Sequence, residues 1–566
     1  MRQLKNILKS IDGKGVQQLS LICGKDYLKC GINYSFSHLE GELVLIEIKI
    51  PLEQLCSVTI SDIESYLTLS YSDFLYRTLY SYINELDGRL INKNKGDSYT
   101  GRIISSPPSD VIVSNNYSYI DSNTNNWVVR IKAILPNSNK KINSEKATKL
   151  LIQFLPNQIQ KFLTHIHDKD YVTIMDHVLD LAREQNFIRQ YICMHGYVGF
   201  IGNGSKLCDE KNVKESRELI LFKSPKEHEV EIKCNNKIIR GMGIPKGFTC
   251  ITGGSYSGKT TFLNALALGV YNYPFGSGKE YIISINDTVT ICMEEKRVIN
   301  STDMRLFYKS MPGNELLLNY SDNCASACVS QAANTVEALT WGARLILIDE
   351  DRSAANFLWR DDTISTLIGT DVFTPFNIIL PSIIKKFDVS CVLVTGSNSS
   401  FLKTADNAFI FDNFRIHSLM INYYDKNTNS NIKDVVIPNL NDEKWIFDES
   451  GQLLFDYKTI EKYLLGDTNE IKVGDSIISI GCWDTVLSQN QVNTLLEFVK
   501  WISHLNYSTP LTFNSLVNQF VYEHTFNISF QSNKERCFKE SPYVYDFFRL
   551  LNRLKVIKKY IKISTE

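Results

Sequence analysis

The sequence predicts a protein of two or three domains whose central domain contains an α/β sheet. Two stretches of the chain predict this fold. Residues 248–252 form an apolar, β-branched run that leads through a glycine-rich loop into the helical pattern of residues 261–268. Further along, the four aliphatic residues 345–348 are followed by three acids. Such a run is typical of a central parallel strand that ends in carboxylates, where open α/β sheets hold their ligands.

Length and composition limit the classes of protein to be considered. A chain of 566 residues is too long for one hydrophobic core, and an apolar content of 43% supports several cores. With a net charge of −1, the chain is not basic overall, as a dedicated nucleic-acid-binding protein would be. The 13 cysteines include no C-x-x-C pair, which predicts reduced thiols in an intracellular, cytoplasmic protein. We expect no membrane span, because no run of about 18 apolar residues occurs.

The pattern along the chain predicts three regions. Residues 1–225 are expected to form an N-terminal α+β domain, residues 226–425 the α/β domain, and residues 426–566 a C-terminal region. The expected elements of the N-terminal domain are helices at 2–12, 72–86, 144–164 and 173–185 and strands at 42–50 and 128–135. Two short strands at 230–233 and 237–240 lead into the α/β domain. The C-terminal region begins β-like at 471–480 and becomes helical at 491–504 and 543–560.

The glycine-rich loop from Gly253 to Thr260 fits the pattern G-x-x-x-x-G-K-[ST] of nucleotide phosphate loops. Its glycines let several backbone N–H groups point inward, and the following helix adds partial positive charge at its N-terminus. Lys259 is expected to reach the β- and γ-phosphates, and the Thr260 hydroxyl is expected to bind Mg²⁺. The predicted cofactors are therefore ATP and Mg²⁺. The predicted nucleotide-binding residues here are Gly253, Gly254, Ser255, Tyr256, Ser257, Gly258, Lys259, Thr260 and Thr261.

The acids that follow residues 345–348 supply the predicted chemistry. Asp349 is expected to hold Mg²⁺ through water, so that Thr260 and Asp349 form the metal site. Glu350 is expected to be the general base that polarises the attacking water. The alternative interpretation is a buried strand followed by a solvated acidic turn. The phosphate loop earlier in the same α/β run favours the metal site.

The order of motifs resembles that of ABC ATPases. A β-rich segment precedes the phosphate loop, a small-residue helix start at Ser326 precedes the acidic strand, and a Ser-Ala-x-Asn turn follows it at 353–356. In ABC ATPases each nucleotide is held between the phosphate loop of one domain and the signature of another. The resemblance implies that Ser326 joins Lys259 and Glu350 as a catalytic residue. It also implies that Gln331, Ser353 and Asn356 contact nucleotide.

This chain has one set of these motifs. A complete site therefore implies a partner, most simply a second copy in a head-to-tail homodimer. The predicted fold class is an ABC-type P-loop NTPase domain of α/β type, with an α+β N-terminal domain and a mixed, mostly helical C-terminal region.

From end to end the chain is similar to the family of predicted ATPases of the ABC class. The matching segments include Gly241-Met242-Gly243-Ile244-Pro245 and Ser330-Gln331-Ala332-Ala333-Asn334. The others are residues 2–4, 11–15, 254–259, 269–272, 276–281, 347–351, 353–357, 360–361, 374–376 and, more weakly, 551–554.

The chain departs from the family pattern in three places. The signature reads Ser326-Ala327-Cys328 where members usually have Ser-Gly-Ser, so Ala327 adds a Cβ and Cys328 removes a hydroxyl donor. No switch histidine follows residues 389–395, where Thr395 or Ser397 is the polar candidate. The Q-loop glutamine is missing; Glu294, after Thr290 and Ile291, is a weak substitute for it and is expected to be a surface carboxylate instead. These departures predict slow turnover more than weak nucleotide binding.

Three functions remain open from the sequence. The first is an ATPase that hydrolyses Mg-ATP at a homodimer interface and acts as a conformational switch. The second is an ATP-dependent RNA-binding or RNA-processing factor, suggested by basic residues at both termini. The third is a nucleotide-binding interaction protein with little turnover. The basic residues are Arg2, Lys5, Lys9, Lys14, Arg549, Arg553, Lys555, Lys558, Lys559 and Lys562, which equally suit ordinary solvated helix faces.

Overall fold

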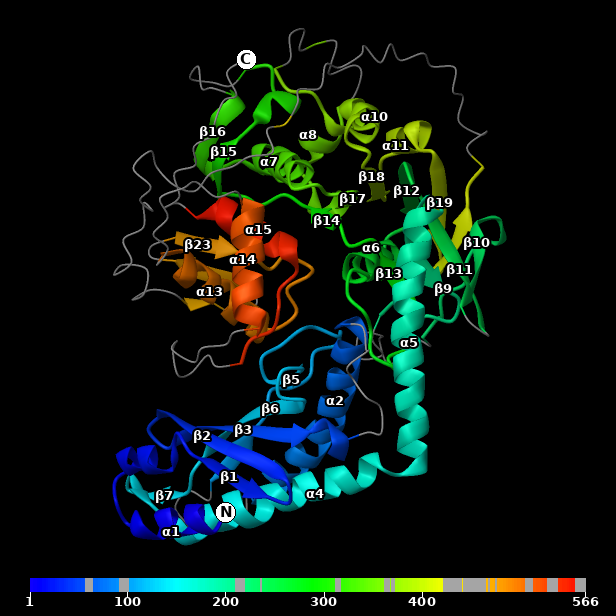
Figure 1. The fold of residues 1–566 in the computed structure, drawn as a ribbon. Coiled ribbons are helices and arrows are strands. Elements are labelled where there is room, and N and C mark those ends of the chain that lie inside the picture. Colours follow the sequence, from blue (N-terminus) through cyan, green and yellow to red (C-terminus); the bar gives the residue numbers. More distant parts are fainter. Residues whose placement is uncertain are drawn as a thin grey trace. The chain divides into compact units, whose positions relative to one another are not determined.

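The computed structural model divides the chain into two compact units (Figure 1). The residues described are 1–55, 65–90, 101–208, 219–234, 237–310, 317–360, 367, 372–420, 440, 465–466, 469–473, 476–503, 513–526 and 538–554. The first unit comprises Met1–Arg183 and His524–Ser541, and the second comprises Glu184–Glu523 and Pro542–Glu566. Across the described residues, no helix is long and apolar enough to cross a bilayer. The predicted exposed loop at 92–101 falls almost entirely outside the described residues.

The first unit is built on a six-stranded antiparallel sheet with the order β1-β2-β3-β6-β4, in which β5 also pairs with β6. Its strands are β1 (Asp26–Lys29), β2 (Ile32–Glu40), β3 (Leu43–Pro51), β4 (Arg102–Ile104), β5 (Ser118–Asp121) and β6 (Asn126–Ile134). Helices α1 (Arg2–Ser10), α2 (Ser65–Leu90), α3 (Ser144–Thr148), α4 (Leu155–Ile166) and the first part of α5 (Lys169–Met194) accompany it. The predicted α+β fold of the N-terminal domain is confirmed.

The helix predicted over residues 144–164 is interrupted. Between α3 and α4 the chain forms a π-helical turn, η4 (Lys149–Phe154). Pro156 follows in the first turn of α4. Proline has no N–H to donate, and its ring collides with the carbonyl four residues earlier in a regular helix. The wider π-turn before Pro156 accommodates both constraints, so one predicted helix becomes two α-helices joined by a π-turn.

The second unit contains the predicted α/β sheet. Strands β14 (Thr288–Ile291), β17 (Leu345–Asp349), β18 (Ser390–Val394), β12 (Phe248–Gly253) and β19 (Asn407–Asp412) run parallel in that order. β20 (Arg415–Ser418) is antiparallel to β19 at the edge. A separate antiparallel sheet has the order β10-β11-β9-β13. Its strands are β9 (Tyr197–Gly202), β10 (Glu229–Cys234), β11 (Lys237–Pro245) and β13 (Ile282–Ser284).

The two units divide after Arg183, earlier in the chain than the boundary predicted after residue 225. Strand β9 explains the difference. It pairs with both β11 and β13, so residues 197–202 are part of the antiparallel sheet of the second unit. Helix α6 (Lys259–Leu268) packs against β13 and against β12, β17 and β18 of the parallel sheet. The helix that leaves the phosphate loop therefore packs against the parallel sheet and against β13, which pairs with β9 in the antiparallel sheet.

The C-terminal elements share the core of the second unit. They include β22 (Glu470–Val473), β23 (Ser476–Ser479), α13 (Gln489–Ser503) and α15 (Val544–Arg553). Buried residues of α13 and α15 belong to one apolar cluster with β14 and with α7 (Ala327–Thr340). Phe548 of α15 stacks on Trp341, which directly follows α7, with 5.2 Å between the ring centroids. Residues 538–541, by contrast, belong to the first unit, where Glu540 accepts a hydrogen bond from Tyr117.

A buried ion pair joins α7 to β15 (Arg297–Thr302). The Arg297 guanidinium contacts the Glu337 carboxylate at 2.8 Å, and the two side chains are only 3% and 1% exposed. Thr302 donates a third hydrogen bond to Glu337 at 3.0 Å. Burial of a charge is tolerated when its partner and hydrogen bonds are present. Removal of the Glu337 carboxylate would therefore leave the Arg297 charge and the Thr302 hydroxyl buried without these contacts.

We predict that Glu337→Ala lowers the free energy of unfolding by about 3–5 kcal/mol, because it leaves the Arg297 charge buried without its partner. Urea denaturation of the full chain measures this change. The matched control is Glu231→Ala, which breaks the exposed pair between Glu231 and Arg240 and is expected to change stability little. Equal effects of the two substitutions would contradict the prediction.

Candidate functional site

The predicted phosphate loop connects an interior strand of the parallel sheet to a helix N-terminus. β12 lies between β18 and β19, and α6 begins at Lys259 directly after the loop. Gly253 has φ +149°, and a Cβ there would lie 2.5 Å from the carbonyl oxygen of Phe411. Gly258 has φ +111°, a conformation that side chains rarely adopt. Glycine is therefore required at both ends of the curled loop.

Polar side chains of the loop converge on its interior. Lys259 is 9% exposed, and its ammonium donates to the carbonyl oxygens of Gly253 at 2.6 Å and Gly254 at 2.8 Å. The Ser257 hydroxyl is buried and has no hydrogen-bond partner among the residues described. Tyr256, in contrast, is 90% exposed and has φ +59°. A buried hydroxyl without a partner, beside an ammonium and a helix N-terminus, suits a phosphate group.

The loop meets the acidic strand through one hydrogen bond. The Thr260 hydroxyl donates to Asp349 Oδ2 at 2.8 Å, although the two residues are 89 positions apart. Asp349 ends β17 and is 3% exposed, and its other oxygen accepts the Asp351 N–H at 3.0 Å. A hydroxyl and a carboxylate at this spacing form the pair of oxygen ligands that Mg²⁺ prefers. The residues predicted as the metal site therefore lie together.

Glu350 is held by the chain that leaves β18. Its Oε2 accepts hydrogen bonds from Thr395 Oγ1 at 2.6 Å and from the N–H groups of Gly396 at 2.8 Å and Ser397 at 3.2 Å. Its Oε1 accepts the Ser397 hydroxyl at 2.7 Å. Burial would raise the pKa of Glu350, but the hydrogen bonds from Thr395 and Ser397 outweigh burial and leave that pKa below its ordinary value. We call residues 395–397 the carboxylate clamp.

The carboxylate clamp lies beside the phosphate loop. A Cβ built on Gly396 would be 3.8 Å from the Lys259 ammonium and 3.9 Å from the carbonyl oxygen of Gly253. This proximity follows from the strand order, because β18 runs between β17 and β12. The polar candidates at the end of residues 389–395, Thr395 and Ser397, both contact Glu350. Lys259, the hydrogen-bonded pair Thr260 and Asp349, and Glu350 thus share the carboxyl edge of the sheet.

Helix α7 and the turn after the acidic strand form a second polar group. Gln331 is fully buried; its amide nitrogen donates to Ser353 Oγ at 2.8 Å, and its oxygen accepts the Ala354 N–H at 2.8 Å. Ser353 in turn donates to the Asp349 carbonyl oxygen at 2.7 Å. Gln331 therefore positions the turn within this chain, whereas Ser326 and Asn356 are exposed. The contacts predicted for these residues with nucleotide stay predictions.

The signature residue Cys328 is half-buried. The Tyr308 hydroxyl points at its sulfur, with 3.9 Å between the two atoms. Burial raises the pKa of the Cys328 thiol. The side chain therefore stays a neutral thiol near pH 7, without the hydroxyl donor usual at this position of the signature.

The expectation that Glu294 is a surface carboxylate is wrong. Glu294 is buried, and its Oε2 accepts a hydrogen bond from Arg553 Nε at 2.7 Å. Its Oε1 accepts from Asn334 of α7 at 3.2 Å, and its backbone N–H donates to Ser330 Oγ at 3.0 Å. No local pattern around Glu294 indicates this role, because Arg553 lies 259 positions away in the chain. Glu294 attaches α15 to the segment that follows β14.

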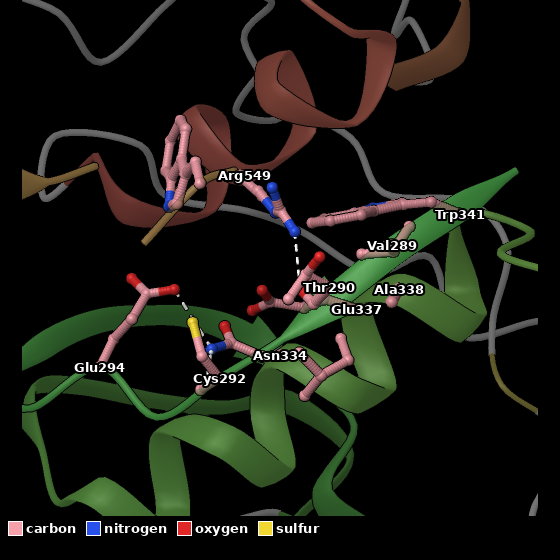
Figure 2. A pocket seen from close by; sticks show the side chains of 11 residues that line it. Val289, Thr290, Cys292, Glu294, Asn334, Glu337, Ala338, Trp341 and Arg549 are labelled. Carbon is pink, nitrogen blue, oxygen red and sulfur yellow. Dashed lines mark hydrogen bonds between the residues drawn. The ribbon is translucent and has the colours of Figure 1, made fainter. Parts of the chain in front are cut away.

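A small cavity adjoins this contact, between β14, α7 and α15 (Figure 2). Its walls include Glu294, Glu337 and Arg549, and it has room for about one water molecule. Arg549 donates to the Thr290 carbonyl oxygen at 2.7 Å. In Figure 2, Glu337 and Arg549 lie between Trp341 on one side and Glu294, next to Cys292, on the other. The cavity is thus a charged junction inside the second unit and is too small for a nucleotide.

The fold and the loop define a P-loop nucleotide-binding protein. Two family models match the chain: the P-loop domain of the ABC-class ATPases over residues 172–437, and the N-terminal domain described as "ATPase of the ABC class N-terminal" over residues 1–165. The chain belongs to the family of ABC-class ATPases, with the N-terminal domain specific to that family. The resemblance drawn from the sequence is confirmed, and nucleotide binding is the property that this family supports.

Similar proteins span different parts of the chain. An uncharacterized protein of Methanocaldococcus jannaschii is 26% identical over 398 residues, which are 64% of this chain and 84% of that protein. The structure of cbiO1 from Clostridium perfringens, part of the ABC transporter complex cbiONQ, is 12% identical and covers 39% of this chain and 87% of its own, with a TM-score of 0.25. An ABC transporter structure in an inward-facing conformation is 13% identical and covers 40% and 84%, with a TM-score of 0.26.

We predict that Thr395→Val destabilises the second unit by about 1 kcal/mol at pH 7, a modest figure because Glu350 is partly exposed. The folded state holds the pKa of Glu350 below its ordinary value of 4.5. The clamp therefore stabilises the fold fully above that pH and loses its effect as the pH falls through the depressed pKa.

Urea unfolding of Thr395→Val and the parent chain from pH 7 down to pH 3 measures this dependence. Thr404→Val is the matched control, because Thr404 bonds only the Phe401 carbonyl oxygen in the part of the chain described. A destabilisation by Thr395→Val that stays constant with pH would show that the clamp does not act on the carboxylate.

Proposed function

We propose that this protein binds Mg-ATP at the loop Gly253–Thr260 and hydrolyses it at an interface between two copies of the chain, so that nucleotide turnover drives a conformational switch. The observation that carries the proposal is the hydrogen bond from Thr260 to Asp349 at 2.8 Å, beside the inward-turned Lys259. These three side chains bring a hydroxyl, a carboxylate and an ammonium to one helix N-terminus. That combination suits a triphosphate with its metal ion better than any uncharged ligand.

In the binding step, the Lys259 ammonium exchanges its two carbonyl partners for phosphate oxygens. The N–H groups of the curled loop and the start of α6 add donors and partial positive charge. Thr260 and Asp349 are the residues that would hold Mg²⁺, and the ion supplies positive charge to the phosphate oxygens when bound. The Ser257 hydroxyl gains the hydrogen-bond partner that it lacks among the described residues.

In the hydrolytic step, Glu350 orients and polarises the attacking water. The carboxylate clamp opposes this role, because it occupies both oxygens of Glu350 and holds its pKa below the ordinary value. A base with a low pKa accepts a proton weakly. We therefore propose that turnover requires Thr395 and Ser397 to release at least one carboxylate oxygen, and that the resting chain is slow.

A second copy supplies the remaining groups. Ser326 is exposed at the N-terminus of α7, a helix of 14 residues, and its side chain does not cap that helix. The exposed Asn356 lies in the short helix α8 (Ala355–Leu358), directly after Ala354, whose N–H donates to Gln331. With one set of motifs per chain, a head-to-tail dimer with two-fold symmetry completes two sites at once. Ala327 and Cys328 weaken this half of the site, which again favours slow turnover.

RNA is not part of this proposal. Arg2, Lys5 and Lys9 are exposed on α1. Their exposure fits an RNA-binding face and an ordinary solvated helix equally well. Of the C-terminal basic residues, Arg549 and Arg553 are buried in ion pairs and thus cannot form the basic surface that the sequence suggested. The other C-terminal basic residues, Lys555, Lys558, Lys559 and Lys562, lie outside the described residues.

A steady-state ATPase assay with and without single-stranded RNA separates the proposed ATPase switch from an RNA-dependent ATPase. Stimulation of hydrolysis by RNA would favour the RNA-dependent function.

We predict that Lys259→Ala abolishes binding of Mg-ATP, because it removes the ammonium that would face the β- and γ-phosphates. Isothermal titration calorimetry on the purified chain measures the affinity. Lys246→Ala serves as the control, since Lys246 is an exposed lysine whose nearest carboxylate, that of Asp388, is 4.0 Å away. Micromolar affinity retained by Lys259→Ala would exclude this loop as the phosphate site.

We predict that Glu350→Gln lowers the hydrolysis rate by about 10²–10⁴-fold, the usual contribution of a general base, and leaves an ATP-bound dimer. A coupled phosphate-release assay measures the rate, and light scattering with and without Mg-ATP measures the mass. The exposed Glu295 provides the control Glu295→Gln. A rate equal to that of the parent chain, or a mass that ATP does not change, would argue against the proposed site.

A further inference from the structure

Two cysteines meet at the junction between the parallel sheet and the C-terminal elements. Cys292 follows β14 directly, and Cys482 lies between β23 and α13. Their sulfur atoms and a carboxylate oxygen of Glu294 all lie within 4.8 Å of one another. The Cys292 thiol points at the Cys482 carbonyl oxygen, with 4.0 Å between the atoms. Figure 2 shows Cys292 with Glu294 and Asn334 beside the small cavity.

We propose that Cys292 and Cys482 are a redox-active dithiol, which a hydroperoxide oxidises to a disulfide that fastens the C-terminal elements to the end of β14. The two positions are 190 residues apart in the chain, so the bond would be a long-range link within the second unit. Both cysteines and the elements around them belong to that unit. Neither takes part in the nucleotide site proposed above.

The charges around the sulfurs favour thiol chemistry over a bound cation. Arg553 donates to both oxygens of Glu294, which withdraws that carboxylate from a metal ion. Arg352 donates to the Cys482 carbonyl oxygen at 2.8 Å. The charges of Arg553 and Arg549 lower the pKa of Cys482, and that of Arg352 opposes the rise in the pKa of Cys292. Positive charge in this junction favours a thiolate and repels a divalent cation.

The two thiols differ in the way that stepwise oxidation requires. Cys482 is half-buried, whereas Cys292 is 4% exposed. The neighbouring Cys292 thiol, together with the charges of Arg553 and Arg549, outweighs burial and holds the pKa of Cys482 below its ordinary value. The same contact and burial raise the pKa of Cys292. Cys482 is therefore the thiol that an oxidant reaches first and that ionises more readily, and Cys292 is the resolving thiol.

The reaction balances with a hydroperoxide as the only oxidant. The Cys482 thiol first loses its proton, and the thiolate attacks one peroxide oxygen; an S–O bond forms, the O–O bond breaks, and the leaving hydroxide takes up the proton that Cys482 released and becomes water. Cys292 then loses its proton and attacks the sulfenic sulfur. An S–S bond forms, the S–O bond breaks, and the departing hydroxide leaves as water with that proton. Two thiols lose two electrons in total, and hydrogen peroxide is reduced to two molecules of water.

The disulfide would act next to the loop that carries Glu350. Arg352 ends the 3₁₀ turn η9 (Glu350–Arg352) and bonds both oxygens of Asp484 at 2.9 Å, two residues beyond Cys482. A covalent link at Cys482 restrains Asp484 and, through it, Arg352. Oxidation is therefore expected to slow ATP turnover, a consequence that rests on the proposed function, whereas formation of the disulfide does not.

The test treats the purified full chain with hydrogen peroxide and maps its peptides by mass spectrometry without reduction. We expect a linked peptide pair containing Cys292 and Cys482, lighter by two hydrogen atoms, that dithiothreitol reverses. Cys482→Ser and Cys292→Ala should each abolish the pair. Cys324→Ser, which changes an exposed cysteine outside the junction, should leave it intact. The parent chain alone suffices if a variant folds poorly.

Two results would overturn the proposal. One is oxidation of the exposed Cys30, Cys193 and Cys324 while Cys292 and Cys482 remain free thiols. The other is protection of both cysteines from alkylation by one equivalent of Zn²⁺ alone, which would make the cluster a metal site. A linked pair in a chain that has no ATPase activity would keep the dithiol and reject the proposed function, so the two failures are distinguishable.

Discussion

Parallel pairing in the second unit brings the functional groups of this protein together. Five strands point the same way, so the chain leaves all of them at one edge of the sheet. The phosphate loop leaves β12, Asp349 and Glu350 leave β17, and the carboxylate clamp leaves β18. Because β18 separates the other two strands, its clamp bonds Glu350 on one side and approaches Lys259 on the other. Any change of strand order would disperse these residues.

A second constraint is the need to neutralise charge inside the unit. Around α15, four arginines meet four acids: Arg297 with Glu337, Arg352 with Asp484, Arg549 with Asp546 and Arg553 with Glu294. Burial raises the pKa of Asp546 to about 6, despite Arg549 and the Thr485 hydroxyl, which lies 2.9 Å and 2.8 Å from the two carboxylate oxygens. Such groups are stable only when every partner is in place. The C-terminal helix is therefore joined to the ATPase core by charge complementarity as well as by apolar packing.

The sequence predicted the parts of the structure that depend on local pattern. The phosphate loop, the strand before Asp349 and the helix after Ser326 are recognisable because their glycines, aliphatic runs and acids are contiguous. The pairing of Glu294 with Arg553 was not predictable, because neither residue carries a local sign of its partner. The same holds for β9, whose membership of the antiparallel sheet depends on β11 and β13. Likewise, the π-turn before Pro156 is a compromise between a helical pattern and one missing donor.

The short turn Glu350–Arg352 is held by hydrogen bonds at both of its ends. At one end, the clamp fixes the Glu350 carboxylate with four hydrogen bonds. At the other end, Arg352 is fixed by Asp484 and by the Cys482 carbonyl oxygen of the C-terminal region. A three-residue turn has little freedom to absorb a displacement at either end. A displacement of the segment around Cys482 and Asp484 that moves Arg352 must therefore be absorbed within three residues or reach Glu350. Among the described residues, this turn is the direct connection between the Glu350 carboxylate and that segment.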